Sequence, residues 1–233
     1  MSGVLYGVGL GPGDPGLITV KSSQLISQAR VIAYPSLAGG ESFARSIAAG
    51  LISPEAEEIV MDVPMTVERA PAQAAYDIGA KKIAMALDSG EDVVCLCEGD
   101  PFFYGSFMYL YARLVADYHI EVVPGVTSIT TCAARAGMPL AARNERLTVL
   151  PGPLPARELR SRIEGAESVA IMKVGRHLNK IRAVIAELGL TGKAAYIERA
   201  SLPNELVCPL ADAPEKAPYF SMIILTKGAD PWL

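Results

Sequence analysis

Residues 97–106 read Cys97-Glu98-Gly99-Asp100-Pro101-Phe102-Phe103-Tyr104-Gly105-Ser106. They follow Val93–Cys97, an apolar run typical of a buried strand, and they precede Phe107–Val115, which can be helical. They therefore form a strand-to-helix turn at the carboxyl end of a strand, where open α/β sheets bind ligands. Two acids, two glycines and three aromatics are more than a bare turn needs, although Gly99 and Asp100 alone would also suit ordinary turn chemistry.

The composition fits a packed protein of one large domain or two small ones. The chain has 233 residues and a net charge of −4. It lacks any apolar run close to the about 20 residues of a membrane-spanning helix, and Met1–Leu5 lacks the features of a signal peptide. We therefore expect a cytoplasmic protein with no membrane partner. The mild acidity disfavours nucleic acid as a main partner.

Cysteine and histidine give little reason to expect redox or metal chemistry. None of the four cysteines belongs to a CxxC pair, and the chain has only two histidines. We expect buried reduced thiols, with Cys95 and Cys97 on opposite faces of their strand. We expect no metal site held by the protein.

In the first half of the chain, short apolar runs alternate with helix-like segments. Strands are expected at residues 3–9, 31–34, 57–61, 93–97 and 120–123, and helices at 19–29, 41–49, 68–87 and 107–115. Thr19 can cap the first helix, and Pro35 should end the second strand. This alternation predicts a mostly parallel sheet with helices on both faces.

The glycine-rich segment after the first strand lacks a phosphate-binding signature. Gly7, Gly9, Gly11 and Gly13 alternate, so the spacing is not GxGxxG, and no lysine follows them as in a P-loop. The alternation resembles the GxGxG of Rossmann-type methyltransferases, but no acid ends the first strand and two prolines stiffen the loop. A purely structural turn is an equal alternative.

The second half of the chain changes character near Pro124. Strands are expected at residues 146–150, 168–174, 194–197, 206–208 and 220–226, with helices ending near residues 136 and 188. Little room is left for helices between the last three strands, so these can pair antiparallel. We predict two α/β domains, residues 1–123 with a mostly parallel sheet and residues 124–233 with a mixed sheet. No flexible linker separates them, so a cleft is expected between them.

Three segments resemble, in order, the signatures of the tetrapyrrole (class III) methyltransferases. They are Gly9–Pro15 followed by Thr19, then Glu98–Gly105, and then Val123–Ser128. Further details resemble the precorrin-2 C-20 methyltransferases of cobalamin biosynthesis within that family: Glu98–Tyr104, Ile171–Arg176, Ile197–Ala200 and Ala217–Ser221.

The resemblance implies a homodimer that methylates C-20 of precorrin-2, giving precorrin-3A. It implies S-adenosylmethionine (SAM) as methyl donor in the cleft between the domains, with S-adenosylhomocysteine as product. It implies cofactor contacts from Pro12, Glu98, Gly99, Asp100, Phe103, Tyr104, Thr127, Ser128, Val174, Ala200, Ser221 and Met222. It places the first glycine-rich loop near the tetrapyrrole.

The catalytic base is not assigned by the resemblance. Relatives that methylate uroporphyrinogen have a functional aspartate after the tyrosine of the second strand, but here Pro35 follows Tyr34. Tyr104, Glu98 or a water molecule could remove the C-20 proton. Either Asp100 or Glu98 is expected to hold the ammonium or ribose of the cofactor.

A basic rim is expected around the substrate site. Precorrin-2 is a polycarboxylate and the protein is net negative, so local cations are needed to attract it. Candidates are Arg135, Arg143, Arg146, Lys173, Arg176 and Arg199, of which Arg176 and Arg199 flank predicted cofactor segments. Any one of them could instead be a solvated surface charge.

Other functions stay open at this point. The chain could act on cobalt-precorrin-2 or at another ring position. The same fold could serve diphthamide synthesis or ribosomal RNA methylation, which the acidic balance disfavours. It could also be a non-catalytic tetrapyrrole-binding or nucleotide-binding module.

Overall fold

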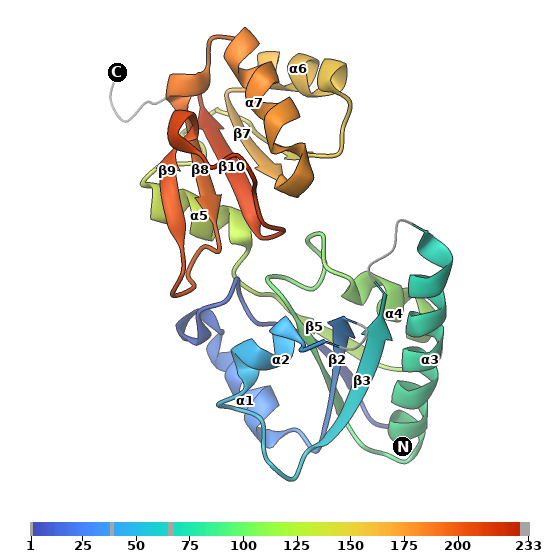
Figure 1. Cartoon of the computed structure of the whole chain (residues 1–233). Helices are drawn as coiled ribbons and strands as arrows, with labels where there is room; N and C mark the ends of the chain where they lie inside the picture. Colours follow the sequence, from blue (N-terminus) through green and yellow to red (C-terminus); the bar gives the residue numbers. More distant parts are fainter. Residues whose placement is uncertain (1, 38–39, 65–67, 229–233) are drawn as a thin grey trace. The chain divides into compact units, whose positions relative to one another are not determined.

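The computed structural model describes residues 2–37, 40–64 and 68–228. The chain divides into two compact units, Met1–Thr127 and Ser128–Leu233. Each unit has its own five-stranded sheet (Figure 1). Each also has its own buried apolar clusters. The expected pair of α/β sheets, the first parallel and the second mixed, is confirmed.

Unit 1 alternates strands with helices. Its elements are β1 (Leu5–Gly9), α1 (Val20–Gln28), β2 (Val31–Leu37), α2 (Phe43–Ala48), β3 (Glu57–Val63), α3 (Arg69–Asp88), β4 (Val93–Cys97), α4 (Phe107–Leu114) and β5 (Ile120–Val123). All the strands run parallel in the order β3-β2-β4-β1-β5. Thr19 caps α1 as expected, because its side chain accepts a hydrogen bond from the Ser22 N–H.

Helices cover both faces of this sheet. Helices α3 and α4 lie on one face and α1 and α2 on the other (Figure 1). Ile83 of α3 and Leu110 of α4 pack on alternate residues of the strands, and Ile26 of α1 and Ile47 of α2 do the same on the other face. The prediction that Cys95 and Cys97 point to opposite faces is wrong, because both thiols belong to the cluster under α3 and α4. Residues i and i+2 of a strand share a face.

Strand β2 continues through Pro35, whereas the sequence predicted that the strand would end there. Beyond Ala33, β2 no longer pairs with β4, and Tyr34–Leu37 pairs only with β3. A proline is tolerated there because one side of the strand has no ladder to interrupt.

Unit 2 has a mixed sheet in the order β6-β7-β10-β8-β9. Its elements are α5 (Ser128–Ala136), β6 (Leu147–Pro151), α6 (Ala156–Glu164), β7 (Ser168–Met172), α7 (Leu178–Glu187), β8 (Ala194–Glu198), β9 (Leu206–Pro209) and β10 (Ser221–Thr226). β10 lies antiparallel between β7 and β8, and β9 is antiparallel to β8, which confirms the predicted antiparallel pairing of the last three strands.

One helix of unit 2 was not predicted from the sequence. Helix α6 packs with α7 on one face of the mixed sheet through Leu159 and Ile163, and α5 contacts β8, β9 and β10. Within the part of the chain that the structure describes, no helix is both long and apolar enough to span a bilayer.

Candidate active site

The carboxyl ends of β1, β4 and β5 meet at one edge of the unit 1 sheet. These strands are neighbours and parallel, with Gly9 beside Cys97 and Val8 beside Val123. The loops that follow are joined directly, because Gly99 donates to Gly11 at 2.8 Å and Gly11 donates to Gly99 at 3.2 Å. The first two signature segments therefore form one surface.

Gly125 brings the third signature segment against the other two. A Cβ atom at Gly125 would lie 2.0 Å from the Gly99 carbonyl oxygen and 2.8 Å from the Gly9 Cα atom. Only a residue without a side chain allows three backbone segments to approach this closely. Gly125 belongs to the third signature segment, but the sequence did not predict its close approach to the other two loops.

The Asp100 carboxylate ties these loops together. Its Oδ1 accepts hydrogen bonds from the backbone N–H groups of Phe102 at 3.0 Å and Phe103 at 3.1 Å. Its Oδ2 accepts from the N–H of Gly125 at 3.1 Å. Asp100 therefore holds both its own turn and the loop after β5 in place.

Glu98 is placed differently from Asp100. It follows β4 directly, and its side chain is exposed and makes no ion pair among the described residues. The protein around it removes enough water to raise the pKa of its carboxyl group. Next to it, Gly99 has a φ of +63° and open space where a Cβ would be, so a ligand could approach its backbone.

The aromatic residues of the same turn are at least partly exposed, and Tyr104 has a strained backbone. Tyr104 has a φ of 56°, unusual for a residue with a side chain, and its ring meets the Phe103 ring edge-on with the two centroids 5.2 Å apart. Such strain persists where the surrounding structure holds it, and it clusters at functional sites. Of the other predicted residues, Pro12 lies half-buried in the first loop and Thr127 ends unit 1.

A second edge, in unit 2, gathers the predicted residues of the carboxyl-terminal half. β7 and β8 run in the same direction on either side of β10, so their carboxyl ends flank the start of β10. The Ser221 hydroxyl accepts from the Gly175 N–H at 3.2 Å and donates to the Pro218 carbonyl at 2.7 Å. The predicted cofactor residues found here or at the start of α5 are Val174, Ala200, Ser221, Met222 and Ser128.

Several of these predicted cofactor residues are buried. Val174 and Met222 have almost no exposed surface, and Ala200 is also buried. Their side chains belong to the interior of unit 2, so they could offer a ligand mainly backbone atoms. The exposed side chains of this edge come from other residues.

Backbone strain marks this edge as well. Lys173, Arg199 and Ser201 all have positive φ angles, of 55°, 50° and 69°. The buried Glu198 precedes Arg199 and accepts hydrogen bonds from the Tyr196 hydroxyl at 2.6 Å and from the Arg199 guanidinium at 2.6 Å. Glu198 lies in a segment that resembles the family, but the sequence predicted no function for it.

The structure separates the candidate basic residues into two groups. Lys173, Arg176 and Arg199 lie at the edge formed by the ends of β7 and β8. Arg135 and Arg146 lie elsewhere and pair with Glu205 and Glu167 respectively, and the Arg146 pair lowers the pKa of Glu167 to about 2. Arg143 lies in the segment between α5 and β6, with a φ of 48°. Arg199 is itself paired with Glu198, but the first group provides the better rim for an anionic ligand because its three cations lie at one strand edge.

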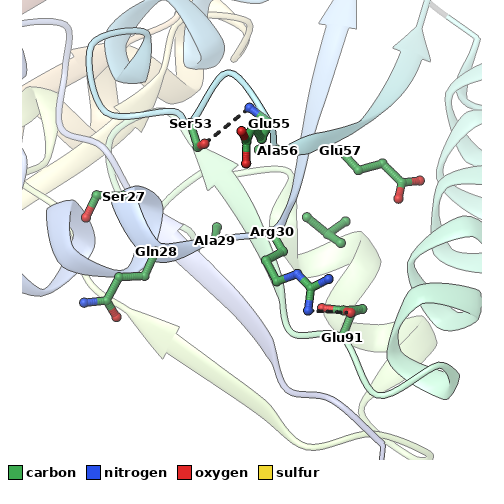
Figure 2. A pocket seen from close by; sticks show the side chains of 10 residues that line it. Ser27, Gln28, Ala29, Arg30, Ser53, Glu55, Ala56, Glu57 and Glu91 are labelled. Atoms are coloured by element: carbon green, nitrogen blue, oxygen red, sulfur yellow. Dashed lines mark hydrogen bonds and ion pairs between the residues drawn. The ribbon is translucent and has the colours of Figure 1, made fainter.

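A hollow of about 420 Å³ lies at the opposite edge of the unit 1 sheet (Figure 2). It opens beside the amino ends of β2 and β3, where Arg30 forms an ion pair with Glu91 at 3.1 Å. None of the residues predicted to bind cofactor or substrate lines it. Among the described residues, no group of three or more His, Cys, Asp or Glu side chains could hold a metal ion.

Comparison with known proteins identifies relatives of this chain. The family model described as Tetrapyrrole (Corrin/Porphyrin) Methylases matches residues 4–214. The precorrin-2 C(20)-methyltransferase of Sinorhizobium sp is 40% identical over 243 residues, 99% of each chain. The cobalt-precorrin-2 C(20)-methyltransferase of Salmonella typhimurium is 30% identical over 231 residues, 97% of this chain and 98% of that one.

A longer relative contains a second region. The cobalamin biosynthesis protein CobIJ of Mycobacterium tuberculosis is 42% identical over 235 residues, which cover 97% of this chain and 46% of that protein. The chain therefore spans about half the length of the CobIJ proteins that it matches.

Solved structures share the fold. The cobalt precorrin-4 methyltransferase CbiF has a TM-score of 0.75 at 24% identity, covering 96% of this chain and 94% of that one. The uroporphyrin-III C-methyl transferase of Thermus thermophilus, solved with S-adenyl homocysteine, has a TM-score of 0.67 at 24% identity, covering 97% and 92%.

Proposed function

The chain belongs to the tetrapyrrole (corrin/porphyrin) methylase family, and from this premise we propose that it transfers the methyl group of SAM to C-20 of precorrin-2, giving precorrin-3A in cobalamin biosynthesis. The observation that carries the proposal is the end-to-end match with a precorrin-2 C(20)-methyltransferase. The joined loops after β1, β4 and β5 support it, because they give the exposed Glu98 a fixed place beside the open backbone of Gly99.

The residues at the unit 1 edge fit an amino-acid sulfonium ligand. The acceptor atoms of Asp100 already serve three backbone N–H groups, so Glu98 is the acid available to hold the ammonium group. Phe103 and Tyr104 add apolar surface on the same turn. Pro12, Thr127, Ser128 and the buried residues Val174, Ala200, Ser221 and Met222 stay predictions based on the family.

The chain contributes mainly orientation to the reaction. When bound, SAM supplies a methyl group that its sulfonium already activates. Rigid loops that hold the reacting atoms in line lower the barrier by removing the entropy cost of alignment. Removal of the C-20 proton falls to Tyr104 or to a water at the same turn, since Glu98 is engaged by the ammonium in this account. If a Tyr104→Phe variant turns over at the wild-type rate, Tyr104 is not the base and a water molecule removes the proton.

The experiment that tests the function measures methyl transfer to metal-free precorrin-2 by mass spectrometry. We expect the product to gain one methyl group at the expense of SAM. Bound SAM without transfer to any tetrapyrrole would sink the proposal and leave a binding module.

A second substrate is favoured by one of the relatives. The Salmonella protein is named for cobalt-precorrin-2, and it aligns over nearly the whole of both chains. Comparison of kcat/KM for the metal-free and cobalt-containing substrates distinguishes the two, and we expect the metal-free compound to be preferred, because the relative named for it is the more similar of the two. We also propose a homodimer, to be tested by light scattering.

A further inference from the structure

An exposed aromatic pair precedes β10 at the unit 2 edge. Tyr219 is 61% exposed and Phe220 is 40% exposed. Their rings lie edge-to-face with centroids 5.1 Å apart. Exposed apolar side chains are common on this protein, so this pair is informative only together with the charged residues around it.

Cationic residues adjoin this pair on both sides. On one side, the Arg199 N–H donates to the Phe220 carbonyl at 2.9 Å, so Arg199 lies beside the pair across the β8–β10 ladder. On the other side, Ser221 bonds to Gly175, which lies between Lys173 and Arg176. The pKa of the neighbouring His177 is lowered by burial first and then by the positive charges of Lys180 and Arg176.

The backbone fixes the positions of these groups. Lys173 and Arg199 both have the left-handed backbone conformation. They directly follow β7 and β8, the two strands that pair with β10. The buried carboxylate of Glu198 accepts from the Arg199 guanidinium and so restricts where it can move. The edge therefore presents an exposed, edge-to-face aromatic pair next to three cationic residues, of which Arg199 is held by Glu198.

We propose that Tyr219 and Phe220 form a platform for the macrocycle of the tetrapyrrole substrate, whose carboxylates pair with Lys173, Arg176 and Arg199. This inference rests on the proposed function and adds two residues to its substrate site. A polycarboxylate macrocycle offers an apolar ring system to the aromatic pair and anionic groups to the basic residues. The residues of this edge that are predicted to contact SAM are buried and could offer it mainly backbone atoms, so the exposed rings of Tyr219 and Phe220 are available to a different ligand.

The test measures binding of uroporphyrin III, a stable and fluorescent polycarboxylate macrocycle, separately from binding of S-adenosylhomocysteine. The variant is Tyr219→Ala with Phe220→Ala in the full chain. We expect its Kd for uroporphyrin III to rise about tenfold, since two aromatic contacts are lost. The Kd for S-adenosylhomocysteine by calorimetry should not change, which also shows that the variant is folded.

A matched control and a rescue variant complete the design. Tyr109→Ala removes a tyrosine of similar exposure from α4 in unit 1 and should leave the Kd for uroporphyrin III unchanged. Tyr219→Phe should bind like the wild type, because the platform needs the ring and not the hydroxyl.

Three results would overturn the inference. They are an unchanged Kd for uroporphyrin III in the double variant, a higher Kd for S-adenosylhomocysteine in the double variant, or no binding of uroporphyrin III to the wild type. A wild type that binds uroporphyrin III through this pair but does not methylate precorrin-2 would contradict the proposed function and leave the platform standing.

Discussion

Asp100 and Glu98 lie in one turn but face different surroundings. Asp100 accepts three backbone hydrogen bonds, and Glu98 follows the strand end with its side chain exposed. We infer that Asp100 maintains the loops and that Glu98 meets the cofactor. The two roles predict different phenotypes for the two acids.

Removal of the Glu98 charge should change how SAM binding depends on pH. Desolvation raises the pKa of Glu98, so it takes up a proton at a higher pH than an ordinary glutamate, and protonation removes the charge that attracts the ammonium. The affinity of the wild type for SAM should therefore be highest above this pKa and fall as the pH drops through it.

Calorimetry from about pH 8 to about pH 5 measures this dependence. Glu98→Gln should bind SAM more weakly at high pH and show little change with pH. Glu57→Gln, which removes an exposed acid at the start of β3, should follow the wild type. A flat wild-type profile would refute the role given to Glu98.

Removal of the Asp100 side chain should loosen the turn. Asp100→Ala should lower the free energy of unfolding by about 2 kcal/mol, because three N–H groups lose a charged acceptor in a partly buried place. Urea unfolding measures the effect, and Asp117→Ala, at an exposed site, serves as the control. If both variants unfold at the wild-type midpoint, Asp100 does not tie the loops.

At the scale of the elements, the contact of Gly9, Gly99 and Gly125 holds three strand ends together. Gly125→Ala would bring a methyl group to within 2.0 Å of the Gly99 oxygen, so the loops must separate. We expect a loss of about 2–4 kcal/mol in the free energy of unfolding and weaker SAM binding. Thermal unfolding and calorimetry with SAM measure the two effects. Gly50→Ala, where a Cβ meets nothing within 4 Å, should be nearly neutral in both measurements. Equal effects of the two substitutions would contradict this account.

Most elements could be predicted because their apolar residues follow a helical or strand period. Helix α6 was missed because only Leu159 and Ile163 of its residues are fully buried, and much of the rest is charged. The hydrogen bonds of Asp100 could not be predicted either, because its partner Gly125 lies 25 residues away, after β5. The order of strands in the sheet brings the two together, and no local pattern contains that order.

The same limit applies to the second unit. The motif Ile197–Ala200 was recognised, but the burial of Glu198 and its two hydrogen bonds depend on how β8 packs. Tyr219 and Phe220 belong to a segment that resembles the family. Only the pairing of β10 with β8 places them beside Arg199, and no local pattern predicts that pairing.

At the scale of the whole molecule, the charge distribution matters more than its sum. The chain has a net charge of −4, yet Lys173, Arg176 and Arg199 gather at one edge of unit 2. A polyanionic substrate should be attracted to that edge, and salt should screen the attraction.

We therefore expect the KM for the tetrapyrrole to rise with ionic strength while kcat changes little. Arg176→Gln should raise KM roughly three- to tenfold at low salt and weaken its salt dependence. Arg162→Gln, on α6, pairs with Glu158 away from this edge and should behave like the wild type. Identical salt profiles for all three proteins would show that the basic edge does not attract the substrate.

The most direct test of the central claim is the position of the transferred methyl group. The protein would be incubated with metal-free precorrin-2 and SAM labelled with carbon-13 in its methyl group, and the product would be studied by NMR. We predict a single labelled methyl group at C-20. A labelled methyl group at another ring carbon, or none at all, would contradict the account.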